Sequence, residues 1–533
     1  MKQHTPPAFN LLDEPWIPVR TRQGAVQEVS LADALLHAQD FAVLAETSPP
    51  NLVALYRVLL AVLHRALTTQ HGRWHDADRA RWFKQGLPEA PLRAYLAQWR
   101  ERFWLFHPQQ PFMQVAALAD AEETKDKRKP WTQISLEGAS GNTPVVFDHC
   151  LDDAPTAIDK ALACRNLLGY LQFTPGGLVK TFRDSDKAGA LSNTAAVIPH
   201  GNTLTETLLL SLHPWDSLRP NDHPAWELPP PAIAALCDPP TLATGPNDRY
   251  TRLSRAVLLL PTDDGQHIRH IRFGAGLGLE DDANAHDPMA CYRITKEDKQ
   301  VRLTYAQGRA LWRELPALVP DVTGKQNLPA AVLSWSANLY NALGQWDAPI
   351  QILTAGLASD QAKLLLWRAE RIELPAAFLL EPDAAANLRQ QMQQVESVYV
   401  NLRGVGASAI AATMPDPQHK DTRSRARAML DNGPTAAVYF SSVERQLPQL
   451  MQQLAQSDLD QAQSQWNAAL ASAVSQAWLA LGHSLGASPA VLRALARAQS
   501  KIGYLLHTLQ PSSPQNPLSP LAATSVTLQE STP

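Results

Sequence analysis

One pattern in the sequence is typical of a hydrolytic enzyme. Gly482-His483-Ser484-Leu485-Gly486 matches G-x-S-x-G, in which a strained strand-to-helix turn exposes a nucleophilic serine. The context does not fit, because residues 466–481 have helical spacing and a catalytic acid and then a histidine should follow. Only His507 and then Glu530 follow. We expect Gly482 or Gly486 to end a helix, and an α/β-hydrolase using Ser484 stays as an alternative.

Other chemical motifs are incomplete. His71 and His75 have the spacing of a helical metal site, but no HExxH motif or nearby cysteine accompanies them. Gly324-Lys325-Gln326 lacks the upstream glycine and the following Ser or Thr of a phosphate-binding loop. The four cysteines are scattered and form no CxxC pair, which fits a reducing, cytoplasmic compartment. The sequence therefore predicts no catalytic residue, no metal ion and no cofactor.

Basic residues gather at several places although the net charge is −4. That net charge does not suggest a nucleic-acid binder, but local patches are sufficient to track phosphates. The candidate phosphate contacts are Lys125, Lys127, Arg128, Lys129, Lys180, Arg183, Arg493, Arg497 and Lys501. The last three share one helix face at i, i+4 and i+8. A solvated charged surface is the alternative for each group.

The N-terminal part combines strand and helix patterns. The 533 residues are too many for one hydrophobic core, so two or more domains are expected. Residues 9–29 have the pattern of short strands around a turn at Gly24, and Ser30-x-x-Asp33 has the form of a capping box. Residues 52–67 predict an apolar core helix. No apolar run approaches the length of a membrane span, and the first residues lack the apolar segment of a signal peptide.

Later patterns divide the chain. Strands are expected at 256–260 and 267–273, and a further short strand at 350–354. After about residue 371 helical spacing dominates, and Ser488-Pro489 is a typical start of a last helix.

These patterns predict an α+β fold. The expected parts are a large irregular N-terminal mixed domain, residues 1–370, a C-terminal four-helix bundle, residues 371–510, and a disordered tail, residues 511–533. Arg423, Arg425 and Arg427 are expected on a loop.

Several motifs in a fixed order along the chain carry a family resemblance. They are Phe9-Asn10-Leu11-Leu12-Asp13-Glu14-Pro15-Trp16-Ile17-Pro18-Val19, Pro111-Phe112-Met113-Gln114, Gly176-Gly177, Leu236-Cys237-Asp238-Pro239 and Ala494-Leu495-Ala496-Arg497-Ala498. Together they span most of the chain, which resembles the CasA family, the large subunit of the type I-E CRISPR surveillance complex Cascade. The opening run itself predicts a core strand.

The resemblance implies a non-catalytic subunit of a crRNA-guided antiviral complex. Such subunits read the protospacer-adjacent motif (PAM) in double-stranded DNA from the minor groove. They then wedge the duplex open to start R-loop formation, while base pairing reads the remaining sequence. The implied partners are other Cascade subunits, the crRNA 5′ handle, double-stranded target DNA and a helicase-nuclease effector, with no membrane. A scaffold that binds only other proteins remains an alternative.

The resemblance also assigns residues. The family's wedge, a short β-hairpin with a glutamine at its tip, maps to Gly356–Ala362, so Gln361 would enter the duplex with Asp360 and Ala362 beside it. Asp360 stands where an asparagine is expected. The backbone amides of Gly176 and Gly177 would meet the acceptor edge that A·T and T·A share in the minor groove.

Two further family features fall on this sequence. The family's lysine finger falls near Arg272, and its mobile DNA-binding loop falls at about residues 143–156. Some members carry a cysteine cluster after the Cys-Asp-Pro landmark, suggestive of zinc. No cysteine follows Cys237 within that segment, so no zinc is expected here.

Overall fold

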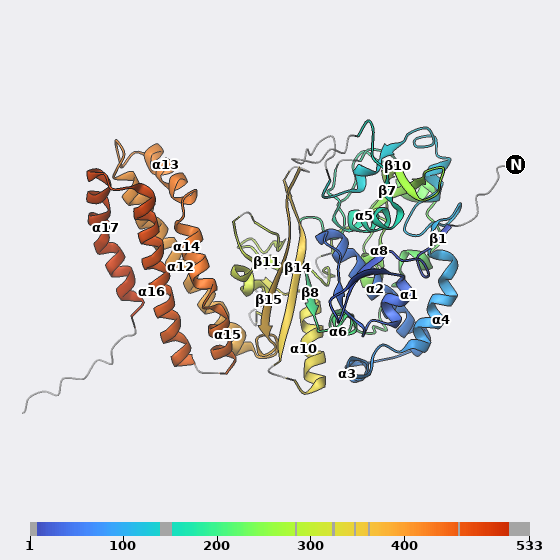
Figure 1. The fold of residues 1–533 in the computed structure, drawn as a ribbon, viewed down its shortest axis with the longest axis horizontal. Helices are drawn as coiled ribbons and strands as arrows, with labels where there is room; N and C mark the ends of the chain where they lie inside the picture. Colours follow the sequence, from blue (N-terminus) through green and yellow to red (C-terminus); the bar gives the residue numbers. More distant parts are fainter. Residues whose placement is uncertain are drawn as a thin grey trace, which may run out of the picture. The chain divides into compact units, whose positions relative to one another are not determined.

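The chain divides into two compact units, residues 1–392 and 393–533 (Figure 1). The computed structural model describes residues 8–138, 152–177, 179–282, 285–306, 308–321, 326–345, 348–360, 363–456 and 459–510. The division falls within the long helix α12 (Pro382–Ala411). The boundary expected at residue 370 lies inside strand β15 (Lys363–Pro375). The tail expected at 511–533 and most of the loop expected at 143–156 lie outside the described residues.

The described part of the first unit contains five small antiparallel sheets. Their strand orders are β1-β5, β3-β2-β4, β12-β11-β13, β15-β14-β8 and β6-β10-β7, with β9 also paired to β10. The shorter strands are β1 (Ala8–Asn10), β2 (Ile17–Thr21), β3 (Val26–Val29), β4 (Phe41–Leu44), β5 (Trp104–Phe106), β6 (Lys129–Pro130), β7 (Ile158–Asp159), β8 (Ala195–His200), β9 (Arg255–Pro261), β10 (His267–Ala275), β11 (Tyr292–Ile294), β12 (Gln300–Arg302) and β13 (Asn327–Leu328).

The first unit also contains many helices. They are α1 (Leu31–Leu36), α2 (Pro49–Ala66), α3 (Asp76–Gln85), α4 (Glu89–Trp99), α5 (Lys160–Phe173), α6 (Leu204–Ser211), α7 (Ile233–Cys237), α8 (Pro246–Thr251), α9 (Leu315–Leu318), α10 (Ala331–Leu343) and α11 (Ala377–Leu380). This mixture of helices and small sheets confirms the predicted α+β class of the N-terminal part.

Helix α2 lies at the centre of the core. All its residues except Arg65 are buried, and it contacts α5 and α8. Together with the π-helical turn Leu67–His71, it is long and apolar enough to cross a membrane by length and composition, so the expectation that no apolar run reaches that length was wrong. Because 89% of its most apolar window is buried inside the protein, a core helix accounts for the same composition.

Local signals in the sequence are confirmed near the N-terminus and around β9 and β10. Ser30 caps α1, and its hydroxyl accepts a hydrogen bond from the Asp33 backbone amide at 3.0 Å. Gly24 turns the chain between β2 and β3 with a φ of 95°, a conformation that favours glycine. Strands β9 and β10 pair as an antiparallel hairpin around Gly265.

The longest strands form a hairpin that the sequence only partly predicted. The short strand expected at residues 350–354 is the start of β14 (Pro349–Asp360), and β15, which was not predicted, pairs along its whole length. Strand β14 also pairs with β8, from Gln351 as far as Gly356. A Cβ atom on Gly356 would lie 2.0 Å from the Thr194 carbonyl oxygen, so this position requires glycine. Beyond Gly356 the hairpin continues as two strands alone.

The second unit is helical, as predicted, but its described residues contain more than four helices. They are the end of α12, α13 (Lys420–Asp431), α14 (Thr435–Glu444), α15 (Leu447–Ala455), α16 (Leu459–Leu485) and α17 (Pro489–Thr508). Pro434 and Pro448 explain the short central helices, because proline starts a helix but does not continue one. At α17, Ser488 is the N-cap and Pro489 the first helical residue, as expected.

Ser484 lies in the last turn of α16, and its hydroxyl donates to the Leu481 carbonyl at 2.8 Å. No strand leads into it, so the nucleophile-elbow alternative is wrong. Gly486, with a φ of 80°, follows the helix as one of the two expected C-terminal glycines.

We expect Ser484→Ala to change the free energy of unfolding by no more than about 0.5 kcal/mol, because the side chain is exposed and bonded only locally. Urea denaturation of both proteins measures this. A catalytic serine on a strained elbow would instead relax on substitution, and the variant would be clearly more stable than the parent.

Candidate nucleic-acid interface

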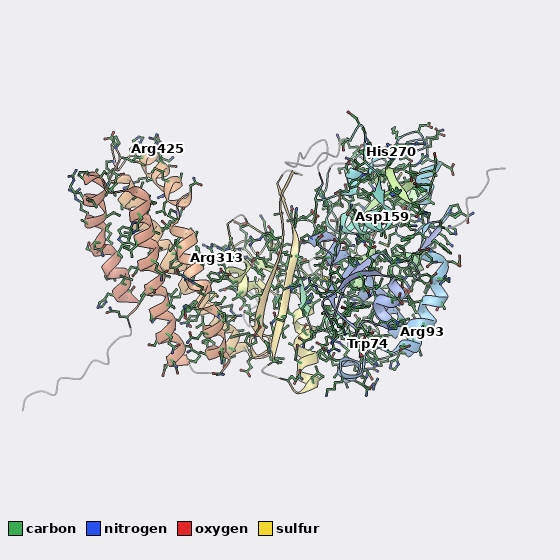
Figure 2. The ribbon with its side chains drawn as sticks, viewed as in Figure 1. Trp74, Arg93, Asp159, His270, Arg313 and Arg425 are labelled. Carbon is green, nitrogen blue, oxygen red and sulfur yellow. The ribbon has the colours of Figure 1, made fainter. Side chains whose placement is uncertain are left out.

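Strand β10 organises the sheet on which several of the candidate DNA-binding residues meet. It pairs with β9 on one side and with β6 and β7 on the other. Ile268 and Ile271 are buried and fix it to the core, whereas Arg269 is exposed. His270 on β10 and Asp159 on β7 lie toward one end of the unit (Figure 2). Strand β10 therefore presents polar side chains at the surface, while its backbone is hydrogen-bonded to other strands on both edges.

A basic segment, residues 125–129, runs onto this sheet. Lys129 belongs to β6, where it pairs with Ile271 of β10. Lys127, Arg128 and Lys129 are exposed. Lys125 is half-buried, and its ammonium group donates to Glu122 at 2.7 Å. Three cations of the segment therefore face solvent, while the fourth is partly neutralised by a neighbouring carboxylate.

Arg272 holds the start of the same segment. Its guanidinium donates to the Thr124 carbonyl at 2.9 Å and lies 3.5 Å from the Leu118 carbonyl. The side chain is half-buried. In this structure the Arg272 guanidinium therefore points toward the backbone just before the basic segment and not into solvent.

The glycine pair lies in the turn that follows α5. Gly177 has a φ of 82°, is exposed, and has no atom within 4 Å of the place where a Cβ would stand. Its amide donates to the Asp186 carbonyl at 2.7 Å. In this structure the Gly177 amide is therefore bonded within its own loop. A Cβ on Gly176 would lie 3.0 Å from the Ala188 amide nitrogen, so this glycine allows the loop to pack on itself.

A buried ionic cluster fixes the glycine loop from within. The Asp186 carboxylate lies 2.9 Å from the Arg255 guanidinium, and both side chains are 0% exposed. Arg255 also donates to the carbonyls of Pro175 and Lys187, one on each arm of the loop. Sequence reasoning missed both residues, because neither belongs to a motif and they are far apart along the chain.

Arg183 belongs to this cluster and not to the surface. Its guanidinium donates to the Leu236 carbonyl at 2.7 Å and to the Gly276 carbonyl, and its side chain is 10% exposed. It is therefore a structural residue here, and a phosphate contact from it is not supported. Lys180, three residues earlier, is exposed and stays available for such a contact.

The third candidate feature is the wedge expected at Gly356–Ala362, which falls at the end of the β14–β15 hairpin. Asp360 is the last residue of β14 and pairs with Lys363, the first of β15. Gln361 and Ala362 lie between them and outside the described residues. Both long strands rise toward the same end of the first unit as β10 and β7 (Figure 1).

Lower on the hairpin, bonds to neighbouring segments hold it. Glu370 accepts from the Leu311 amide at 2.9 Å, and Tyr305 and Thr354 share a hydrogen bond at 2.7 Å. The part next to β8 is therefore the fixed base of the hairpin.

The remaining basic candidates lie in the second unit. Arg493, Arg497 and Lys501 are all exposed on α17, as their spacing predicts. Arg423, Arg425 and Arg427 lie on helix α13 and not on a loop, so that expectation was wrong; Arg425 is labelled in Figure 2. These residues are exposed on two helices of the second unit.

Metal binding has no support from side-chain clusters. Within the described ranges, no group of three or more His, Cys, Asp and Glu side chains is placed to hold a metal ion. Cys237 is exposed, while Cys164 and Cys291 are buried and unpaired. The candidate interface therefore consists of the basic side chains, the glycine loop and the β14–β15 hairpin described above.

Comparisons with known proteins agree on one family. The family model described as CRISPR-associated protein Cse1 matches residues 10–477. A CRISPR-associated protein CasA/Cse1 from Thermus thermophilus is 34% identical over 511 residues, which cover 94% of this chain and 98% of the relative. The chain therefore belongs to the CasA/Cse1 family of CRISPR-associated proteins.

Solved structures show the same fold. That of Thermus thermophilus CasA matches with a TM-score of 0.80 and 31% identity, covering 94% of this chain and 100% of the other. Thermobifida fusca Cse1 matches with a TM-score of 0.77 and 23% identity over 94% of this chain and 98% of the other. A chain from a structure described as a CRISPR RNA-guided surveillance complex matches with a TM-score of 0.72 and 21% identity, over 93% of this chain and all of that one.

Proposed function

We propose that this chain is a non-catalytic subunit of a crRNA-guided Cascade complex that reads the PAM in double-stranded DNA and opens the duplex beside it. The observation that carries the proposal is the long β14–β15 hairpin, whose base also pairs with β8 while its last residues pair only with each other. Gln361 and Ala362 follow Asp360 at its far end. A side chain inserted between base pairs must come from such a rigid support, because unstacking costs a few kcal/mol per step.

The β10 sheet supplies the complementary part of the proposal. Exposed Lys127, Arg128, Lys129 and Lys180 are available to phosphates, which position a duplex without reading its sequence. Gly177 has open space where a side chain would stand, so a groove edge can approach the backbone closely there. Because the Gly177 amide is bonded within its own loop, shape and close approach are favoured there over a direct hydrogen bond.

The proposed partners follow from the same role. They are the other Cascade subunits, the crRNA 5′ handle, target DNA and a helicase-nuclease effector, acting in the cytoplasm. The similarity of this fold to a chain of an RNA-guided surveillance complex supports the assembly partners. The hydroxyl of Ser484 donates to the Leu481 carbonyl inside helix α16, which leaves no observation in favour of a hydrolase. If the chain were only a protein-binding scaffold, a change in the hairpin would leave DNA binding and opening unchanged.

The wedge is tested with Gln361→Ala in the reconstituted complex with its crRNA. We expect R-loop formation on a PAM-bearing duplex to fall at least about tenfold, because the variant loses the side chain that replaces base stacking. A duplex with the first PAM-adjacent pairs already mismatched should restore it, since no opening is then needed. Permanganate footprinting of the opened strand measures both.

Gln351→Ala is the matched control, since Gln351 is an exposed glutamine on β14 near the hairpin base, bonded to Glu373 at 2.6 Å. It should leave R-loop formation unchanged. Equal R-loop formation by Gln361→Ala and the parent, with the complex assembled, would refute the wedge and favour the scaffold.

A further inference from the structure

Strand β15 presents one row of side chains to solvent. Alternate residues from 367 to 373 are exposed, and the residues between them are half-buried. The exposed ones are Trp367, Ala369, Arg371 and Glu373. Since alternate residues of a strand point to the same face, these four form one row. The strand is also the edge of its sheet, whereas the residues opposite the first three on β14, which are Leu357, Ala355 and Leu353, are buried.

Trp367 is an unusual side chain for such a position. It is 43% exposed and stands opposite Leu357, the first position of β14 beyond the segment that β8 holds. Its ring neither stacks on nor bonds to any residue that the structure describes. Edge strands are normally protected by charges and not by large apolar groups, which invite contact with other molecules. The ring is therefore available to a ligand with an apolar or aromatic face.

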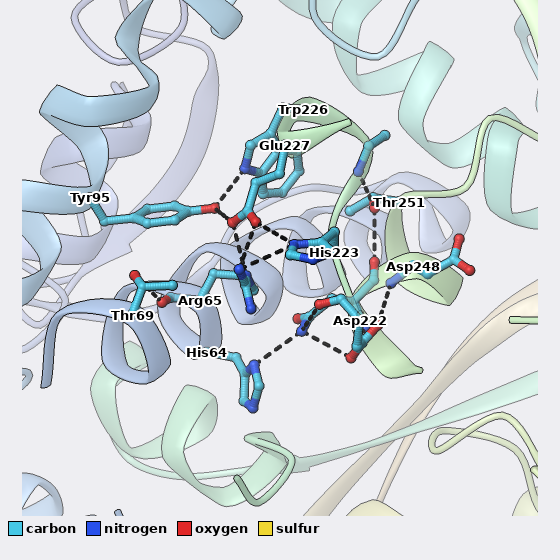
Figure 3. Close-up of polar contacts among 12 residues, drawn as sticks. His64, Arg65, Thr69, Tyr95, Asp222, His223, Trp226, Glu227, Asp248 and Thr251 are labelled. Carbon is cyan, nitrogen blue, oxygen red and sulfur yellow. Dashed lines mark hydrogen bonds and ion pairs between the residues drawn. The ribbon is translucent and has the colours of Figure 1, made fainter. Parts of the chain in front are cut away.

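Arg371 adds a positive charge to the same row. Its guanidinium makes no hydrogen bond or ion pair with a residue of the described ranges. Other arginines of the first unit are held by carboxylates. Arg65 donates to both oxygens of Glu227, at 2.8 and 2.7 Å (Figure 3), and Arg368, on the opposite face of β15, is paired with Glu370. Arg371 is thus able to bind an anion from solvent.

The ring and the cation together favour single-stranded nucleic acid. Proteins that bind such strands stack bases on aromatic side chains and hold phosphates with cations along the same surface. Trp367 and Arg371 are four residues apart, about 13 Å at the rise of a strand. A protein partner is disfavoured, because charged residues are depleted at the centre of protein interfaces and the row places only Ala369 between ring and guanidinium. The carboxylate of Glu373 follows Arg371 and marks the end at which phosphates would be repelled.

The row lies on the hairpin whose end carries the proposed wedge. Trp367 is four residues from Lys363, which pairs with Asp360 at that end, so it lies about 13 Å along the strand. When a duplex opens there, one strand pairs with the crRNA and the other loses its partner. The bases of the strand without a partner then need a new stacking surface, and the Trp367 ring is within a few nucleotides of the opening.

We propose that Trp367 and Arg371 bind the first unpaired nucleotides of the displaced DNA strand. One base stacks on the Trp367 ring, and a neighbouring phosphate pairs with the Arg371 guanidinium. This inference rests on the proposed function and gives the hairpin a second role, since its end opens the duplex and its side retains the released strand. Stacking on Trp367 opposes closure of the duplex, because the base would have to leave the ring in order to pair again.

The test uses the assembled complex with its crRNA and duplexes that carry 2-aminopurine at successive positions of the displaced strand beside the PAM. This base fluoresces strongly when unstacked and weakly when stacked on an aromatic ring. After R-loop formation by the parent, one position should stay dim while its neighbours become bright. Trp367→Ala should make that position bright, and Trp367→Phe, which keeps an aromatic face, should leave it dim.

Nuclease digestion of the same nucleotides gives a second reading. Trp367→Ala should speed it at least about fivefold, the ratio that corresponds to loss of one weak base–ring stack. Arg371→Gln should speed it as well, and Arg371→Lys, which keeps the charge, should speed it less. Val301→Ala is the matched control, because Val301 is 49% exposed on β12, the edge strand of another sheet. It should match the parent in both readings.

A duplex with its PAM-adjacent pairs already mismatched separates this site from the wedge. On that duplex Gln361→Ala should show the same dim position as the parent, and Trp367→Ala should not. If every position were equally bright in the parent and in Trp367→Ala, the proposal would be overturned. Loss of Trp367→Ala from the complex in size-exclusion chromatography would assign the row to a neighbouring subunit and would overturn it too. A wedge that fails its own test, with the dim position still dependent on Trp367, would leave this site standing.

Discussion

Asp186→Ala should lower the free energy of unfolding of the first unit by about 3–5 kcal/mol. The substitution leaves the fully buried Arg255 guanidinium without its carboxylate, and removing one partner of a buried ion pair has a cost of that size. It also removes the acceptor of the Gly276 amide. Urea denaturation followed by tryptophan fluorescence measures the loss.

The same variant should weaken PAM-dependent DNA binding beyond what its lower stability explains. Arg255 joins the two arms of the glycine loop through the carbonyls of Pro175 and Lys187, so the loop should lose its shape when Arg255 shifts. Asp184→Ala is the control, an exposed aspartate two residues away, and should change stability by no more than about 0.5 kcal/mol. Equal stability of the two variants would show that Asp186 does not hold the loop.

Arg272→Met should release the basic segment and so weaken DNA binding indirectly. The carbonyls of Thr124 and Leu118 lose a charged donor, and hydrogen bonds of that kind contribute about 1.5–3 kcal/mol. In the free protein, amide hydrogen exchange at residues 118–130 should become faster by a factor of about 10 or more, which is the same free energy expressed as a rate ratio.

Arg269→Met is the matched control, because Arg269 is an exposed arginine on the same strand that donates a long hydrogen bond, 3.4 Å, to the Pro155 carbonyl. It should leave exchange at residues 118–130 unchanged. If Arg272→Met weakened DNA binding while that exchange stayed the same, Arg272 would contact DNA directly, and the positioning role would be wrong.

The sequence was a good guide wherever structure depends on near neighbours. The cap at Ser30, the turn at Gly24, the β9–β10 hairpin and the start of α17 at Ser488 all involve bonds between residues a few positions apart. Backbone preferences and short-range hydrogen bonds decide such features. The ordered motifs likewise indicated the family, which the comparison with the Thermus thermophilus relative confirms.

The hairpin shows where local signals fail. Its two strands run 12 and 13 residues, but only residues 350–354 were predicted. Strand β14 is stabilised by β8, which is more than 150 residues earlier in the chain. Strand assignment depends on such partners more than on intrinsic preference. The register of the β14–β15 pairing, and not the glutamine itself, brings Asp360 and Lys363 together at the end of the two strands.

The sequence by itself determined the family, the mixed and helical halves, and the local turns and caps, because each depends on residue types and short spacings. Only the tertiary structure decided what the charged side chains do. Arg272 and Arg183 were both candidates for DNA contact. Their guanidinium groups instead bind carbonyls of segments up to 154 residues away along the chain. An arginine has the same sequence signature whether a phosphate or a backbone carbonyl satisfies its donors, and only folding determines which acceptor lies within reach.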